Sequence, residues 1–353
     1  MNWTNKVTQL LKIKIPFVSA PMLVVTTPEM VAATSNLGCL GSLPLGFFPK
    51  QRAIDNIQAV KKLTNKPFAV NFFAYDAPNK IPDLPAKVLR SYYEKNNIPF
   101  YPEIPHKDPF TYYTELIDTI IEENVPVVSF HFGIPDAKTL NKLKSNGIVT
   151  IATATCVDEA KMIEDKGVDI ICAQSFEAGG NKGTFINGDA PEIGLISLLP
   201  RVVDAVKIPV IAAGGLMQGR SVAAAFMLGA QGAQFGSLFL RSKESGAPSS
   251  WKEAVKNSDD RSTTLTRAWS GRFGRCIKND YVMAMTKEEL HPSPIQHYLT
   301  NKMREEGRKR NDPELQSLWA GQSANYAEEK STKEILENII KDTENILTKP
   351  FSF

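Results

Sequence analysis

The sequence is poor in the residues that build disulfide frameworks and metal centres. Its 353 residues contain only four cysteines and four histidines, and no two cysteines form a CxxC pair. Three of the cysteines lie in apolar, strand-like surroundings, which is typical of small buried hydrophobes. We therefore expect neither a disulfide framework nor a metal site from this set: Cys39, Cys156, Cys172 and Cys276.

The chain also lacks a strong excess of charge and a long apolar run. Its 41 basic and 38 acidic residues leave a net charge of +3, and basic residues cluster only in 304–310. We interpret that cluster as a solvated helix face. No apolar stretch approaches the roughly 18 residues of a membrane span, and the first residues lack the pattern expected of a signal peptide. These absences predict a cytoplasmic protein that binds neither nucleic acid nor membranes.

What the sequence does contain is a regular alternation of short apolar runs and helical patterns. This alternation is typical of a parallel sheet with crossover helices. Eight strands favour a closed α/β barrel, the (β/α)₈ or TIM barrel, because an open doubly wound sheet would need a glycine-rich first turn. Residues 19–29 contain no such turn. The predicted strands are 15–22, 39–44, 67–74, 125–132, 148–155, 168–175, 208–215 and 232–237.

Two parts of the chain break the alternation. Residues 75–110 hold seven prolines and have a helical pattern only around 86–95. Residues 241–353 have helical periodicity without strands and end in an amphipathic pattern at 332–347. We therefore expect two units, a barrel and a smaller, mostly helical layer that covers its catalytic mouth. The predicted ranges are 1–74 and 111–240 for the barrel, and 75–110 and 241–353 for the helical layer.

Glycines follow the last two predicted strands, where barrel enzymes place their sites. Gly214 and Gly215 end the seventh strand, and Gly236 and Ser237 end the eighth. Backbone N–H groups at such positions can approach an anion, and a following helix N-terminus adds its positive dipole. The pattern predicts a phosphate site, although tight strand-to-helix turns alone would also use these glycines.

Other strand ends carry groups that suit a flat ring system. Gly179 and Gly180, after the sixth strand, could let the backbone approach such a ring closely. Asn71 and Gln174 are amides that fit the N3–H and carbonyl edge of an isoalloxazine, or that stabilise a loop. His131 alone among the histidines ends a strand, either as a catalyst or as a satisfied core residue. The remaining histidines are expected in surface-like segments: His106, His291 and His297.

Several motifs, taken in order, resemble the class I nitronate monooxygenases, formerly called 2-nitropropane dioxygenases. The resemblance covers nearly the whole chain except parts of 75–110 and the final helix. It implies an FMN-dependent enzyme that oxidises alkyl nitronates, such as propionate-3-nitronate, with O₂ to a carbonyl compound and nitrite. The motifs occupy residues 19–44, 67–73, 129–135, 174–185, 209–240, 269–279 and 318–323.

The resemblance also implies roles for individual residues. FMN would bind in the barrel, and Tyr298 would line the substrate cavity from the helical layer. The partners would be a small-molecule nitronate and O₂, while a homodimer is left open. The residues implied to contact FMN are Pro21, Met22, Asn71, Gln174, Gly179, Gly180, Gly214, Gly215, Gly236, Ser237 and Gln322.

One position departs from the family pattern. The EAGG motif normally continues with a histidine that is credited as the base towards neutral nitroalkanes, and here that position is Asn181. Asparagine cannot accept a proton at ordinary pH, but its amide can donate a hydrogen bond to an anionic nitro group. The simplest inference is an enzyme that acts on nitronates only, with Asn181 as a catalytic residue and the strand-end His131 as the other candidate. Loss of activity or a different flavin reaction is the alternative.

Other functions remain open on the sequence alone. A related FMN barrel could take hydride from NAD(P)H as a quinone or enoyl-thioester reductase, and its flavin would then bleach anaerobically with that donor. The chain could also bind flavin without turnover. A phosphate-binding lyase or isomerase without flavin would purify colourless.

Overall fold

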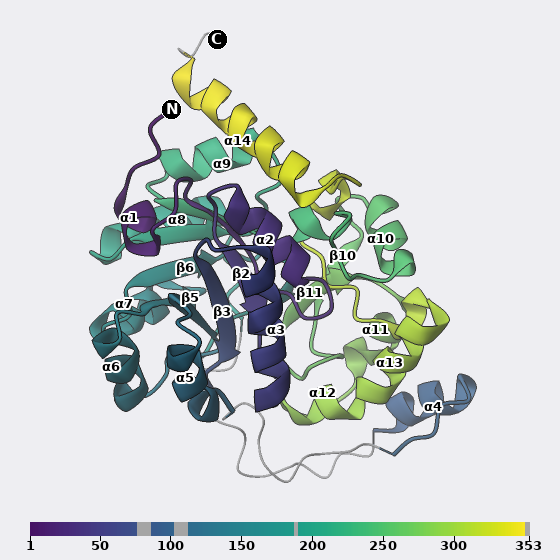
Figure 1. The fold of residues 1–353 in the computed structure, drawn as a ribbon. Helices are drawn as coiled ribbons and strands as arrows, with labels where there is room; N and C mark the ends of the chain where they lie inside the picture. Colours follow the sequence, from purple (N-terminus) through teal and green to yellow (C-terminus); the bar gives the residue numbers. More distant parts are fainter. Residues whose placement is uncertain (76–85, 102–111, 187–189, 350–353) are drawn as a thin grey trace.

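The fold is an eight-stranded parallel α/β barrel, seen in a computed structural model that describes residues 1–75, 86–101, 112–186 and 190–349 (Figure 1). The strand order is β1-β9-β8-β6-β5-β4-β3-β2. A parallel bridge between Val18 and Leu40 joins the two edges. Every strand of the barrel falls inside its predicted range: β1 Phe17–Ser19, β2 Gly41–Pro44, β3 Phe68–Phe73, β4 Val127–His131, β5 Val149–Ala154, β6 Ile170–Gln174, β8 Val210–Ala213 and β9 Gly232–Phe235.

Helices connect successive strands and cover the outside of the barrel (Figure 1). Their starts follow ordinary capping chemistry. At the first of them, the Thr27 hydroxyl oxygen accepts the Met30 N–H, and Pro28 occupies the first turn. The connecting helices are α2 Pro28–Asn36, α3 Lys50–Leu63, α5 Tyr112–Glu122, α6 Ala137–Ser145, α7 Val157–Asp165, α8 Leu195–Ala205 and α9 Gly219–Met227.

The barrel interior is closed by side chains at the amino ends of the strands. Val18, Ile151 and Ile211 belong to one buried cluster, to which Val7 and Leu11 of helix α1 (Lys6–Leu11) also belong. Since these side chains fill the amino-terminal end, only the carboxyl ends of the strands are left to form a pocket.

Three of the four cysteines are buried, as predicted for small hydrophobes. They are Cys39, Cys172 and Cys276, whereas Cys156 is partly buried, and none is in a disulfide. Burial raises the pKa of each of the three buried thiols to about 12.

The prediction that residues 241–353 lack strands is wrong. Strands β10 (Thr263–Thr266) and β11 (Gly274–Ile277) pair with each other, and β11 pairs with β7 (Gly180–Asn181), all antiparallel. These strands are too short for a readable alternation, and β7 lies in a glycine-rich loop. The small sheet ties the loop after β6 to the C-terminal region.

Helices from distant segments share a second hydrophobic core. Helix α4 (Lys87–Lys95), which matches its predicted position, contributes Tyr93, and its hydroxyl donates to Leu299 O at 2.6 Å. Trp269 and Met303 belong to the same core. The other helices of the C-terminal region are α10 Ser249–Lys256, α11 Asp280–Ala284, α12 Ile295–Leu299, α13 Asn301–Arg310 and α14 Thr332–Thr348.

Helix α14 lies along α9 and α2 on the outside of the barrel (Figure 1). The final helix, predicted to lie in the layer over the mouth, therefore packs on the outside of the barrel instead. An amphipathic helix can pack over the mouth of the barrel or against its outer helices, and the sequence periodicity is the same in both cases. Across the described ranges, no helix is long and apolar enough to cross a membrane.

Candidate active site

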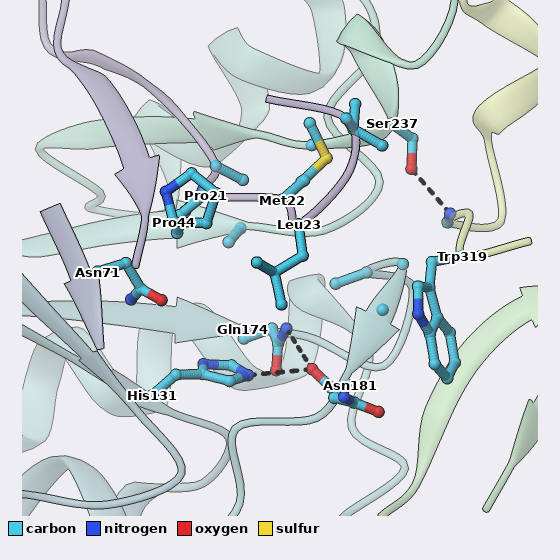
Figure 2. Close-up of a pocket in the computed structure, with 18 of the residues that line it drawn as sticks. Pro21, Met22, Leu23, Pro44, Asn71, His131, Gln174, Asn181, Ser237 and Trp319 are labelled. Carbon is cyan, nitrogen blue, oxygen red and sulfur yellow. Dashed lines mark hydrogen bonds between the residues drawn. The ribbon is translucent and has the colours of Figure 1, made fainter. Parts of the chain in front are cut away.

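A pocket of about 270 Å³ opens at the carboxyl ends of the barrel strands (Figure 2). Residues after β1, β6, β8 and β9 form one side, and residues of the C-terminal region form the other. The predicted site residues that line it are Pro21, Met22, Asn71, His131, Gln174, Gly179, Gly180, Asn181, Gly214, Gly215, Gly236 and Ser237.

Two predicted site residues do not line the pocket. The Gln322 N–H donates to Glu177 O at 3.0 Å, while its neighbours Gly321 and Ser323 face the cavity. Tyr298 on α12 is also absent from the lining, and the preceding residue, His297, takes that place. Successive helical residues point about 100° apart, so one position separates a lining side chain from a non-lining one.

The glycines after β8 and β9 form a pocket wall without side chains. Gly214 and Gly215 have φ of 113° and 70°, which favours glycine. A Cβ on Gly214 would lie 2.2 Å from Ser175 Oγ, so this glycine is required by packing. A Cβ on Gly236 would contact Met22 Sδ at an ordinary 3.6 Å, so a side chain there has room.

The long helix that follows the glycines after β8 begins just beyond the residues that line the pocket. Helix α9 begins at Gly219, which does not line the pocket and packs against Asp342 of α14. Ser237 instead contributes its hydroxyl, whose oxygen accepts the Gly321 N–H at 2.8 Å. Any anion at this wall would therefore contact glycine backbone and Ser237.

A buried lysine holds the loop that precedes the glycine pair 179–180. The Lys182 ammonium donates to the carbonyl oxygens of Ser175, Phe176 and Ala178. Burial, with Arg275 as the next cause, lowers the pKa of Lys182 to about 7. Sequence reasoning missed Lys182, because nothing in its spacing indicates that the side chain folds back beneath its own loop.

Gln174 and His131 both bind the backbone of Asn181 (Figure 2). Gln174 Nε2 donates to Asn181 O at 3.2 Å, and Gln174 Oε1 accepts the Gly183 N–H at 2.8 Å. His131 Nε2 is 3.1 Å from Asn181 O, and Nδ1 is 3.1 Å from Thr153 Oγ1. Both side chains therefore position the loop that carries Asn181.

His131 is a neutral imidazole at neutral pH. Burial lowers its pKa to about 4, and the positive charges of Arg272 and Lys182 act in the same direction. Because Asn181 O can only accept, Nε2 carries the hydrogen, and Nδ1 accepts from the Thr153 hydroxyl. Neither nitrogen is available to take a substrate proton in this arrangement.

The Asn181 side chain is oriented by the C-terminal region. The Ser270 hydroxyl donates to Asn181 Oδ1 at 2.8 Å. Asn181 Nδ2 has no acceptor within the described ranges, and the residue lines the pocket. This amide nitrogen is therefore a hydrogen-bond donor available to a ligand.

Asn71 supplies a hydrogen-bond acceptor, which complements the donor of Asn181. Its Nδ2 donates to Ser129 Oγ at 2.9 Å and to Ser129 O at 3.2 Å. These bonds leave Asn71 Oδ1 directed into the pocket as an acceptor (Figure 2). The pocket thus holds a fixed acceptor on the β3 side and a fixed donor on the loop after β6.

Several predictions for the helices of the C-terminal region are wrong. Arg304 and Arg308, predicted to lie on a solvated helix face, are partly buried and line the pocket. His297, predicted in a surface-like segment, stacks on Phe47 with ring centroids 4.6 Å apart. His291 is also buried. His106 lies outside the described residues.

Arg304 donates from Nη2 to His297 O at 2.8 Å and lies 3.2 Å from His297 Nδ1. Burial, followed by the charges of Arg304 and Arg308, holds the pKa of His297 well below its ordinary value. This second imidazole is therefore also neutral and occupied. Where the structure is described, no group of three or more metal-ligating side chains was found.

Eight parallel strands with a pocket of backbone, amide and imidazole groups at their carboxyl ends define an α/β-barrel enzyme. The sequence profile of the nitronate monooxygenase family matches residues 4–342. The chain belongs to that family and is an oxidoreductase.

Individual relatives agree with this assignment. A probable nitronate monooxygenase of Staphylococcus saprophyticus is 38% identical over 366 aligned positions, covering 99% of this chain and all of the relative. The crystal structure of nitroalkane oxidase from Streptomyces ansochromogenes matches with a TM-score of 0.89 and 34% identity, covering 98% of this chain and 99% of that one. FabK from Thermotoga maritima matches with a TM-score of 0.78 and 29% identity, covering 98% and 97%.

Proposed function

We propose that this chain is an FMN-dependent enzyme that oxidises alkyl nitronates with O₂ to a carbonyl compound and nitrite. Membership of the nitronate monooxygenase family supports the reaction class. The observation that carries the proposal is that Asn181 lines the pocket with an amide nitrogen that has no acceptor among the described residues. The imidazoles of His131 and His297 are both engaged in hydrogen bonds.

The pocket residues fit FMN. The wall of Gly214, Gly215 and Gly236 leaves backbone accessible to a phosphate. Asn71 Oδ1 suits the ring N3–H, and the open space beside Gly180, where a Cβ would have no neighbour within 4 Å, suits a flat ring. When bound, FMN would supply the electron-accepting chemistry that amino-acid side chains lack.

The chain's own residues would bind and orient the substrate. Asn181 Nδ2 would donate to a nitro oxygen, and an anionic acceptor makes such a bond stronger than a neutral one. Gln174 and His131 fix the backbone of Asn181, and Ser270 fixes its amide. Because none of these groups takes up a proton at neutral pH, the proposed substrate is the preformed nitronate, with propionate-3-nitronate as the first candidate.

Oxygen consumption and nitrite release test this proposal directly. The purified holoprotein is assayed with preformed propionate-3-nitronate and, separately, with 3-nitropropionate at the same pH. We expect turnover of the nitronate and a much lower rate with 3-nitropropionate, whose nitro-bearing carbon is not ionised. A retained flavin with no turnover of any nitronate would overturn the proposal and favour a binding protein.

A second candidate function is that of an NAD(P)H-dependent quinone or enoyl-thioester reductase, and the structural similarity to FabK supports it. An anaerobic titration separates the two functions. Bleaching of the flavin absorbance by NADH or NADPH would favour the reductase. A spectrum that NAD(P)H leaves unchanged, but that nitronate changes, would favour nitronate oxidation.

A further inference from the structure

Arg304 lines the pocket, and among the described acids Glu305 acts on its charge without forming an ion pair with it. It makes no ion pair with an acid in the described ranges, and its buried Nε atom has no hydrogen-bond partner there. Among the described residues, its hydrogen bonds are made by Nη2 with His297. Arg308, one turn further along α13, lines the same pocket and also lacks an ion pair with a described acid.

An arginine in this position keeps its charge. Burial, with Arg308 as the next cause, lowers the pKa of Arg304 to about 10, which leaves the guanidinium protonated at neutral pH. A partly buried charge without a counter-charge is unfavourable, and charges in such places are usually paired. A bound anion would complete the site.

The guanidinium is held by His297, and the start of its helix is anchored separately. His297 accepts from Nη2 through its carbonyl oxygen, and its ring is fixed by stacking on Phe47 at an interplanar angle of 7°. The preceding turn is anchored where the Thr300 hydroxyl donates to Trp269 O at 2.7 Å. This support reduces the conformational entropy that a ligand contact would otherwise cost.

Arg304 and Asn181 approach the pocket from different parts of the fold. Asn181 belongs to the loop after β6, whereas Arg304 belongs to α13 of the C-terminal region. Residues 269 and 270 link them, because Trp269 O binds Thr300 and the Ser270 hydroxyl binds Asn181. The pocket is therefore lined by two hydrogen-bond donors from different segments, the Asn181 amide and the Arg304 guanidinium.

We propose that Arg304 is a specificity-determining residue that binds a carboxylate on the substrate while Asn181 binds the nitro group. The inference rests on the proposed function and adds a requirement to it, a second anionic group on the nitronate. A carboxylate can accept two hydrogen bonds from a guanidinium, and that pairing is both strong and directional. An uncharged alkyl tail would leave the arginine without a counter-charge.

The kinetic test compares two nitronates of similar length, propionate-3-nitronate and propyl-1-nitronate. Arg304→Gln should lower kcat/KM for the carboxylated substrate by about 10- to 100-fold, the usual effect of losing a hydrogen bond to a charged group. The value for propyl-1-nitronate should change less than about threefold. Arg304→Lys should recover part of the loss, and Lys309→Gln, an exposed position on the same helix, serves as the matched control.

Ligand binding provides a readout that does not require turnover. Succinate has the length and both charges of the carboxylated nitronate, and succinamide is its uncharged counterpart. By calorimetry on the holoprotein, succinate should bind the wild type at least tenfold more tightly than Arg304→Gln, and succinamide should not distinguish them. Thermal unfolding of each variant establishes that it is folded.

The outcomes separate this inference from the proposed function. Equal losses on both nitronates, or no loss on either, would overturn the role of Arg304 while nitronate oxidation still stood. Unchanged succinate affinity in Arg304→Gln would overturn it as well. If the wild type oxidises no nitronate, the proposed function fails, even where succinate binding still depends on Arg304.

Discussion

The His131 imidazole binds the backbone carbonyl of Asn181, with Nε2 3.1 Å from Asn181 O. This hydrogen bond joins the two residues that the sequence offered as catalysts, and it gives them different roles. His131 becomes a positioning residue, because both of its nitrogens are occupied and its pKa is lowered to about 4. Asn181 keeps an amide donor for the substrate.

Asn181→His should selectively increase the rate on neutral nitroalkanes. A general base typically contributes about 10²- to 10⁴-fold, and asparagine cannot act as one. We expect the ratio of the nitroalkane rate to the nitronate rate to rise at least tenfold, measured by oxygen consumption with both substrate forms. Asn181→Ala is the control, and it should weaken nitronate binding without raising the nitroalkane rate. A wild type that already uses both forms equally well contradicts this prediction.

His131→Asn should leave the ratio of nitroalkane to nitronate rates unchanged, because His131 does not act as a base. We expect both rates to fall together, since the Asn181 backbone loses a hydrogen bond. The same assays on the two substrate forms provide the measurement. A selective loss of nitroalkane oxidation would show that the imidazole does accept a proton.

The lowered pKa of His131 also predicts the pH dependence of stability. Between about pH 6.5 and pH 4 the unfolded chain binds a proton that the folded chain does not. The stabilisation is therefore complete above about pH 6.5 and declines as the pH falls towards 4. Thermal unfolding across this window should show a smaller pH dependence in His131→Asn than in the wild type. Identical slopes would contradict the assignment of a neutral, buried imidazole.

Gly236→Asp should purify largely without FMN. A carboxylate there would stand next to the proposed phosphate, and repulsion at ~4 Å is on the order of 4 kcal/mol at an effective dielectric of ~20. That energy corresponds to roughly a thousandfold in affinity. Gly236→Ala is the matched control, because φ is −109° and a Cβ has space. The flavin-to-protein absorbance ratio measures occupancy, and full occupancy in Gly236→Asp would place the phosphate elsewhere.

The purified wild type should be yellow and should release FMN, and not FAD, on denaturation. The pocket has one side-chain-free wall, formed by the glycines after β8 and β9, and the sequence has no dinucleotide-binding turn after its first strand. Chromatography of the released flavin identifies it. Recovery of FAD, or a colourless protein, would contradict the cofactor assignment.

Repeating patterns made the barrel predictable. Apolar runs bounded by turn residues identified all eight strands, and the carboxyl ends of those strands then indicated where site residues meet. This logic brought Asn71, Gln174 and the glycines after β8 to one pocket. It could not assign partners, so Gln174 and His131 could not be recognised as supports for Asn181.

Sequence patterns did not predict which side chains of a helix face the pocket, because this depends on what packs against the helix. Arg304 and Lys309 share one basic helix, yet Arg304 lines the pocket while Lys309 is exposed. Tyr298 and His297 are adjacent, and only the rotation of α12 against the barrel places His297 in the cavity. Strands β10 and β11 gave no signal either, because four residues are too few to show a period.

The sequence by itself therefore determined the barrel, the location of its site and the absence of a protonatable group at position 181. These properties depend on local periodicity and on residue identity, both of which are present in the chain before it folds. Only the tertiary structure decided that His131 is neutral and that Arg304 faces the pocket. Burial, hydrogen-bond partners and unpaired charge are created when distant segments pack together, and local sequence does not record them.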